Sequence, residues 1–496
     1  MGKRTRKQTQ LIHIQGRRAE AFRQLTEGIP NDQILFAPLD IGKNADWAAF
    51  HTRDGLLLHE PIEVSTLKAG YERYVNTLDD LVARHHPQLV ILGHEPTGVY
   101  HESWARNLNA RYAEHLAGRA APRFIYQWVN SYQVKLNRTQ TTLSFNKTDL
   151  IDLGSIGDLL MRGLGFPARL PTATDLLVRQ EVYSIRAIQA EQRRVANRVI
   201  ATFDQLIPGA FLNPRRFARA HPNLPVPSPL ATRPLERQLV EALITLCPNP
   251  HQILALGNQG IIDLFHQHGY RCGPKTADRI LGVVQRALLP PADVAPAFAA
   301  ILKREFAHHQ FLTAQHQQAI DNLESLLPTT TARHLLAIPG TSPHLVARYL
   351  TGVGNVDDVL FAGQVWKKAG MTPSLYISGD VVIHGEMSKQ GDPFFRDTLY
   401  LLGYHLALHC AYFGDTFLNA IERGKSEVEA TIHTAHKANR VFIHLLQQDE
   451  PFDPPDISDY DTFCCQWQAR MNRYLAEKKK SRQRKAKSRR RPRKHT

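Results

Sequence analysis

Short apolar runs near the start of the chain constrain its fold most strongly. The runs ILFAPLDIG, WAAFHT and LLLHEPIEV come first, a helical stretch follows from Leu67 to His85, and QLVILGHEP and RFIYQWV come later. Asp54-Gly55 separates the second and third runs, and Asp-Gly between two apolar runs is a strong hairpin signal. Three antiparallel strands, a helix, a strand, a helix and a further strand are the element order of the ribonuclease-H-like fold, although many α/β domains begin similarly.

The pattern changes to long amphipathic helices after this domain. Apolar residues recur three and four apart between about 170 and 207 and again from Phe298 to Leu327, on either side of a proline-rich insert. This predicts a helical stalk, either as a dimerising coiled coil or as an intramolecular helical hairpin. A mostly helical region follows from Thr331 to about Gln448, and residues 450–458 have the composition of a linker.

Composition excludes several classes of protein. The length of 496 residues predicts two or three domains. No apolar run approaches the roughly 20 residues that cross a bilayer, so we expect no membrane segment and a cytoplasmic protein. The five cysteines form no CxxC pair, which predicts reduced thiols rather than a disulfide framework or a zinc finger.

Positive charge is concentrated at the two ends of the chain. Residues 470–496 hold fourteen Lys and Arg against one Glu, and residues 1–24 hold seven against one, whereas the whole chain carries a net charge of +15. The body between the ends is therefore slightly acidic. Basic arms on such a body are typical of proteins that contact a polyanion, and nucleic acid is the expected one, with a solubilising tail as the alternative.

Four acidic residues follow or begin predicted elements. Asp40 ends the first strand in LDIGK, and Glu95 follows another strand in ILGHEPTGVY. Asp149 and Asp152, in NKTDLIDL, share one face if that segment is helical. Each acid alone could be a turn cap, a surface charge or part of a solvated helix face. Together, four converging carboxylates would repel one another unless divalent cations lay between them, and oxygen ligands with open water sites favour Mg²⁺.

The motifs around these acids resemble a known family. LDIGK, HEPTGVYHESW and NKTDLIDL are similar to the three acidic motifs of the DEDD transposases of bacterial insertion sequences, the bridge-RNA-guided recombinases related to pilin-gene invertases. Downstream, IPGTSPHLVARYL, FAGQVWKKAGMTPSLYISG and GEMSKQGDPFFRDTLYLLGYHLAL resemble the C-terminal domain of that family. The sequence departs from the pattern at Pro96, at Ser342 and in its long middle segment.

The resemblance implies roles for several residues. Asp40, Glu95, Asp149 and Asp152 would hold Mg²⁺ in a RuvC-like domain. Ser378, of the dipeptide Ser378-Gly379, would be the nucleophile and would form a phosphoserine link to DNA. Ser374 is its main competitor. Lys389 and Arg396 match basic positions of the family and would hold a scissile phosphate or the RNA backbone, or else be ordinary surface charges.

The fold class expected is α/β plus all-α, in five segments. These are a basic N-terminal extension (1–30), a RuvC-like DEDD catalytic domain with a ribonuclease-H fold (31–165), a helical coiled-coil stalk with a Pro-rich insert (166–330), a mostly helical C-terminal serine transposase domain (331–450), and a linker with a basic tail (451–496). The expected partners are donor and target DNA, a structured noncoding guide RNA, and further copies of the chain in a dimer or tetramer.

Two alternatives remain beside an RNA-guided DNA recombinase. The first is a RuvC-like nuclease or junction resolvase that cleaves with metal-activated water and makes no use of Ser378. The second is a noncatalytic nucleic-acid-binding derivative of a transposase. The presence of acids at all four positions counts against the second alternative, because a binding protein has no need of them.

Overall fold

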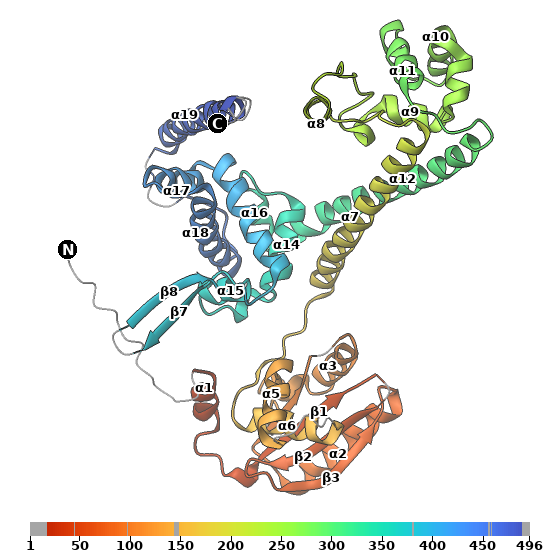
Figure 1. Ribbon diagram of the computed structural model, residues 1–496. Helices are drawn as coiled ribbons and strands as arrows, with labels where there is room; N and C mark the ends of the chain where they lie inside the picture. Colours follow the sequence, from red (N-terminus) through yellow and green to blue (C-terminus); the bar gives the residue numbers. More distant parts are fainter. Residues whose placement is uncertain are drawn as a thin grey trace. The chain divides into compact units, whose positions relative to one another are not determined.

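The computed structural model describes residues 17–43, 45–96, 98–142, 148–378, 381–454, 457 and 459–488. The chain divides into two compact units, Met1–Leu170 and Pro171–Thr496 (Figure 1). The first combines a sheet with helices and the second is mostly helical, so the chain is mixed α/β. Within the described ranges, no helix combines the length and the apolar character needed to span a membrane.

The first unit is built on a six-stranded mixed sheet in the order β3-β2-β1-β4-β5-β6. Strands β1, β2 and β3 are successively antiparallel, β1, β4 and β5 are parallel, and β6 is antiparallel to β5. The predicted Asp54-Gly55 turn joins β2 and β3, and Gly55 has a φ of 88°, a conformation that glycine adopts without steric cost. The strands are β1 (Ile34–Ile41), β2 (Asp46–Thr52), β3 (Leu57–Val64), β4 (Leu89–His94), β5 (Arg123–Trp128) and β6 (Phe166–Pro167).

Side chains of β1 alternate between two hydrophobic cores, one on each face of the sheet. Leu35 and Leu39 pack with α2 and α3, whereas Ile34 and Phe36 pack with α6. Burial on both faces explains why β1 is an almost continuous apolar run. The observed order of strands and helices is the predicted one, but order alone does not distinguish a ribonuclease-H-like fold from other α/β domains. The helices of this unit are α1 (Arg17–Thr26), α2 (Lys68–His85), α3 (Tyr100–Arg111), α4 (Ala113–Leu116), α5 (Ser131–Thr142) and α6 (Asp149–Met161).

Two long helices, α7 (Ala173–Leu206) and α12 (Ala295–Leu326), pack along each other in the second unit (Figure 1). Arg198 Nε donates to a Glu305 carboxylate oxygen at 2.9 Å, and Asn322 Nδ2 donates to Glu181 at 2.7 Å. The two amphipathic stripes therefore meet within one chain. Within the chain, these helices form an intramolecular hairpin, and dimerisation through the stalk stays a prediction.

A small helical module with its own core lies between α7 and α12 in the sequence. Its helices are α8 (Pro214–Ala220), α9 (Gln238–Leu246), α10 (Pro250–Gln267) and α11 (Pro274–Arg286). Phe203 of α7 and Leu302 of α12 belong to the same buried cluster as the module, so its core is continuous with that of the helical hairpin. Helix α10 is broken at Gly257, whose φ of 63° lies in the left-handed region.

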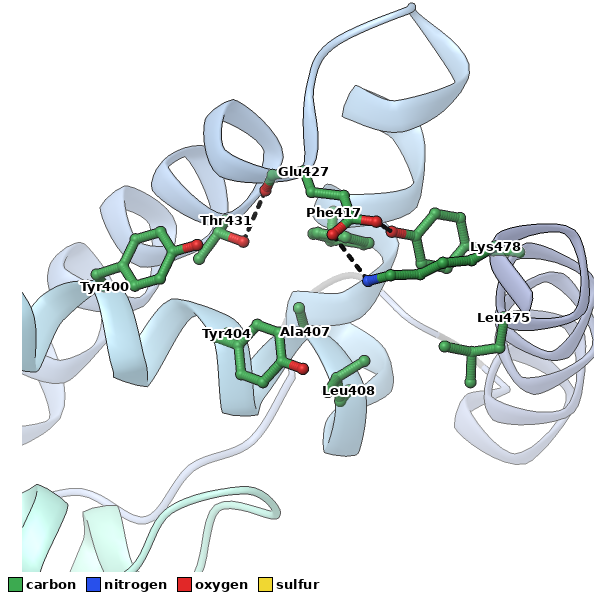
Figure 2. Close-up of a pocket in the computed structure, with 10 residues that line it drawn as sticks. Tyr400, Tyr404, Ala407, Leu408, Phe417, Glu427, Thr431, Leu475 and Lys478 are labelled. Carbon is green, nitrogen blue, oxygen red and sulfur yellow. Dashed lines mark hydrogen bonds and ion pairs between the residues drawn. The ribbon is translucent and has the colours of Figure 1, made fainter. Parts of the chain in front are cut away.

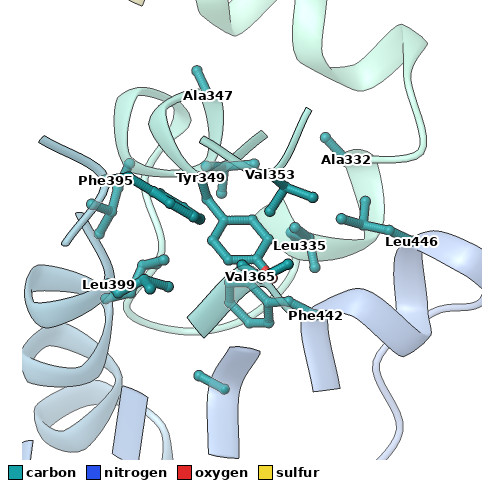
Figure 3. Close-up of a cluster of buried hydrophobic side chains, with 14 of the residues drawn as sticks. Ala332, Leu335, Ala347, Tyr349, Val353, Val365, Phe395, Leu399, Phe442 and Leu446 are labelled. Carbon is teal, nitrogen blue, oxygen red and sulfur yellow. The ribbon is translucent and has the colours of Figure 1, made fainter. Parts of the chain in front are cut away.

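Another buried cluster of the second unit is centred on Tyr349 (Figure 3). The Tyr349 ring packs against Phe395 and Phe442, and its hydroxyl donates to Asn439 Oδ1 at 2.9 Å. This satisfied hydroxyl allows a tyrosine to fill the centre of an apolar core. The elements of this region are α13 (Arg333–Leu336), α14 (Pro343–Val353), α15 (Ala362–Lys368), β7 (Pro373–Ser378), β8 (Val381–Met387), α16 (Pro393–His409), α17 (Ala411–Glu422) and α18 (Glu427–Gln448).

The segment that composition identifies as a basic tail begins with a helix, α19 (Tyr460–Ser488). Trp467 and Met471 lie about one turn apart on α19 and are buried in a cluster with residues of α16, α17 and α18. Their four-residue spacing was the sequence signal for this helix, but the run of Lys and Arg that follows dominates the composition.

Candidate active site

The carboxyl ends of β1 and β4 bring Asp40 and Glu95 next to each other. The two strands are parallel neighbours, and the residues that precede the acids, Leu39 and His94, are paired in register. The first two of the predicted site residues, which lie far apart in the sequence, are therefore adjacent at one edge of the sheet.

Asp40 falls on the face of the sheet that α6 covers, and Glu95 directly follows a strand that packs on the same helix. Asp40 comes four residues after Phe36, and Glu95 comes four residues after Ile91, and both of these apolar residues pack on the α6 side. Side chains an even number of residues apart along a strand share a face. Strand register thus places Asp40 on the α6 side of the sheet, Glu95 follows the end of β4, and both residues are half-buried.

The first turn of α6 lies at the same edge. Gly163, just after the end of α6, contacts Phe22, whose ring packs beside the amino-terminal half of β1. Gly157, closer to the start of the helix, contacts Pro38 in the carboxyl-terminal half of β1. Helix α6 therefore runs opposite to β1, and its first residue, Asp149, lies toward the strand ends that carry the other acids.

Asp149 and Asp152 occupy the first turn of α6 but differ in their surroundings. Thr148 caps the helix, and its hydroxyl accepts from the Ile151 N–H at 3.3 Å. Asp149 is exposed, whereas Asp152 is 7% exposed and forms an ion pair with Arg138 of α5 at 2.5 Å. Sequence reasoning missed Arg138, because nothing in the local pattern links it to an acid on the next helix.

The four acids are not closed into a coordination shell. Among the described residues, no group of three or more Asp, Glu, His or Cys side chains is arranged to hold a metal ion. The donor set at this edge nevertheless fits Mg²⁺, which prefers carboxylate oxygen. The guanidinium of Arg138 beside Asp152 shows that the edge accommodates a positive charge. Metal binding by the four acids stays a prediction.

A buried histidine holds the backbone of Glu95. His94 Nε2 lies 2.7 Å from the Tyr126 hydroxyl and accepts from the Trp128 indole N–H at 3.2 Å, so Nδ1 carries the ring proton and donates to the Glu95 carbonyl at 3.1 Å. Burial lowers the pKa of His94 to about 3, which keeps the ring neutral. No local sequence pattern indicates this contact, because Tyr126 and Trp128 belong to the next strand.

Asp46 plays a comparable role beside Asp40. Its carboxylate accepts from the Gly42 N–H at 2.8 Å and from the Trp104 indole N–H at 3.0 Å, and burial raises its pKa. Asp46 thereby fixes the turn that follows Asp40 and ties it to α3. It is a positioning residue that the sequence analysis did not single out.

The second predicted site lies on the hairpin of β7 and β8. Ser378 ends β7 and pairs with Val381, whereas its side chain and the whole of Gly379 lie outside the described residues. Its competitor Ser374 lies near the base of the hairpin, where its hydroxyl donates to the Glu386 carbonyl at 3.1 Å. Ser374 is thus engaged across the hairpin, and the choice of Ser378 stays a prediction.

Arg396 binds the backbone at the base of this hairpin. Its Nη1 donates to the carbonyls of Ala369 and Lys389, at 3.2 and 3.3 Å. Lys389 is exposed and has a φ of 55°. The structure therefore gives Arg396 a local structural contact, and the predicted phosphate contact of both residues stays a prediction.

Comparison with known proteins connects this region to a family. Residues 332–416 match the family model of the Transposase IS116/IS110/IS902 family, a stretch that runs from α13 into α17 and includes the β7–β8 hairpin. No curated protein matches the chain. Over residues 332–416 the chain is similar to IS110-type transposases, and this match supports an insertion-sequence transposase.

Proposed function

We propose that the protein is an insertion-sequence transposase that cuts and rejoins DNA with four acidic residues and a serine. Asp40, Glu95, Asp149 and Asp152 hold Mg²⁺, and Ser378 is the nucleophile. The observation that carries the proposal is the shared sheet edge, at which β1, β4 and the first turn of α6 meet. The family match at 332–416 adds independent support for a transposase.

The acids differ in what binding a cation requires of them. When bound, Mg²⁺ would help to activate the attacking oxygen and to stabilise the leaving one. Asp40, Glu95 and Asp149 meet it from two strand ends and a helix start. Asp152 contacts the guanidinium of Arg138, and binding the cation requires it to share or release this contact. His94 keeps Glu95 in place through the backbone.

Ser378 supplies the covalent step. Its oxygen loses a proton and forms a bond to phosphorus, while the bond from phosphorus to a deoxyribose oxygen breaks and that oxygen takes up a proton. The resulting phosphoserine retains the bond energy, so the reverse attack by a deoxyribose hydroxyl rejoins a strand. Of the two basic candidates, the exposed Lys389 suits a phosphate contact better than Arg396, which already binds two carbonyls.

The proposal extends to fold and partners. The strand and helix order of the first unit supports a RuvC-like domain, and the α7–α12 hairpin supports a helical stalk. The motifs that resemble bridge-RNA-guided recombinases support a structured guide RNA that pairs with donor and target DNA, and a dimer or tetramer. An RNA that copurifies with the protein tests this part: a discrete transcript supports guidance, and random fragments contradict it.

A covalent adduct with DNA tests the nucleophile. End-labelled DNA carrying the element's ends is incubated with protein, its copurified RNA and Mg²⁺, and the products are separated on a denaturing gel. We expect a protease-sensitive adduct with the unchanged protein and with Ser374→Ala, and none with Ser378→Ala. Ser374→Ala is the matched control, because it removes the same hydroxyl from the same hairpin.

Two outcomes would overturn parts of the proposal. Strand cleavage by Ser378→Ala without any adduct would indicate a nuclease that uses water. Binding without cleavage or adduct in the unchanged protein would indicate a noncatalytic derivative. Loss of cleavage in Asp149→Ala with DNA binding preserved is the result that supports the acids as catalytic groups.

A further inference from the structure

Helix α19 has two halves of different character. The first half is docked: Trp467 and Met471 are buried in a cluster that includes Phe417 of α17 and Ala430 of α18. The second half, residues 478–488, contains seven Lys or Arg and no acidic residue. We call the docked segment, residues 460–477, the mount, and residues 478–488 the basic half of α19.

Ion pairs fix the first half of α19 from the side of α17. Arg470 donates to Asp415 at 2.6 Å, to Asn419 at 2.7 Å and to Glu422 at 2.9 Å. Arg470 is partly buried, with 26% of its side chain exposed, so these charge-assisted bonds are stronger than those of a fully exposed pair. The three acceptors lie on one face of α17 at spacings of three and four.

A second contact fixes α19 to the start of α18. The Glu427 carboxylate accepts from Lys478 Nζ at 2.7 Å (Figure 2). It also accepts from the Tyr474 hydroxyl at 2.7 Å. These three residues line a small pocket between α16, α18 and α19, together with Tyr404 and Leu475. Lys478 is therefore paired within the protein, and Lys479 is the first exposed basic residue of the second half.

The basic half begins at Lys478, the residue that contacts Glu427 of α18. Lys479 and Lys480 are exposed. The backbone continues as a helix to Ser488, so residues 478–488 extend over roughly 16 Å at 1.5 Å per residue. This is a charged helix rather than a coil, and the mount fixes the direction in which it leaves α17 and α18.

We propose that the basic half of α19 is a docking helix for duplex DNA, held in a set orientation by its first half. Phosphate is the partner that the uniform positive charge favours. The major groove of B-form DNA, about 12 Å wide, admits an α-helix, whereas the deep, narrow major groove of A-form RNA does not. The contact is with the backbone and does not read sequence. The identity of the DNA as donor or target rests on the proposed function.

Salt dependence of binding tests the docking helix. The double variant Lys479→Gln, Lys480→Gln is compared with Lys303→Gln, Arg304→Gln, which removes the same charge from an exposed face of α12. Binding to a B-form DNA duplex without the element's sequence is measured by anisotropy between 50 and 200 mM salt. Two lost phosphate contacts lower the slope of log K against log salt by about 1.8 in the α19 variant, and the α12 variant keeps the slope of the unchanged protein.

Equal decreases of the salt slope in both variants would show that α19 contributes only nonspecific positive charge. A larger decrease of binding to an A-form RNA duplex than to DNA would assign the helix to RNA.

The mount is tested with Arg470→Met by hydrogen exchange. We expect faster exchange over residues 460–477, whereas slow exchange unchanged from that of the parent protein would overturn the mount. Neither assay requires Mg²⁺ or cleavage, and both can be run in Ser378→Ala, so failure of the proposed chemistry leaves this inference standing.

Discussion

Arg396 shows how one side chain can support a hairpin from outside it. Its guanidinium joins the carbonyls of Ala369 and Lys389, which lie before and after the hairpin. The same junction brings Gly370 and Gly391 together so closely that a Cβ on Gly391 would lie 2.4 Å from the Gly370 nitrogen. No side chain fits where the backbones of Gly370 and Gly391 meet, and the hydrogen bonds of Arg396 hold these two segments together. From the sequence pattern alone, Arg396 could contact either a phosphate or backbone carbonyls, because the pattern carries no information on which carbonyls lie nearby.

Arg396→Met keeps the apolar stem of the side chain but removes its N–H donors. We expect the amides of Ser388 and Lys389, which bond to Thr372 and Gly370, to exchange faster. The loss of local stability should be about 1–3 kcal/mol, because two carbonyls lose a charged donor. Hydrogen exchange measures this, with Arg304→Met on the exposed face of α12 as control. An unchanged exchange rate, combined with a salt slope of DNA binding lower by about 0.9, would instead make Arg396 a phosphate contact.

At the scale of elements, periodicity predicted most of what the structure shows. The nearly continuous apolar run of β1 and the three-and-four spacing of α7 and α12 both reflect burial, which local sequence records. The departure from the family pattern at Ser342 also has a local reason, because its hydroxyl accepts from the Leu345 N–H and caps α14. Which helix packs on which could not be predicted, since such contacts join residues far apart in the chain.

Gly403 marks a helix contact of this kind. It lies inside α16, where a Cβ would meet the Thr431 carbonyl oxygen at 2.5 Å and the Ala435 Cβ at 2.8 Å on α18. Gly403→Ala should destabilise the second unit by about 1–3 kcal/mol despite the better helix propensity of alanine. Gly282→Ala in α11, where the nearest atom is Arg286 Nη1 at 3.5 Å, should stabilise by up to about 1 kcal/mol. Urea denaturation compares the two, and equal effects would contradict the close approach.

At the scale of the molecule, the predicted chemistry is divided between two units. Every hydrophobic cluster lies within one unit or the other. All four predicted metal ligands belong to the first unit, whereas Ser378 and the stretch that matches the transposase family belong to the second. The sequence placed Asp40 and Glu95 at the ends of strands, but the parallel pairing of these strands, which makes the two acids neighbours, depends on contacts between distant parts of the chain. The pairing of Asp152 with Arg138 could not be predicted, because it depends on how α5 packs against α6.

This division predicts that Mg²⁺ stabilises one unit and not the other. We expect two thermal transitions, since each unit has its own cores, and Gly403→Ala identifies the second unit by lowering only its transition. Mg²⁺ at a hundredfold excess over its Kd should add about 2.7 kcal/mol to the first unit alone. Asp149→Asn should abolish the shift, and Asp158→Asn, a partly exposed acid later on α6, should keep it. Calorimetry with and without Mg²⁺ measures both transitions. A shift that persists in Asp149→Asn, or that affects the transition of the second unit, would show that the acids at the sheet edge are not the metal site.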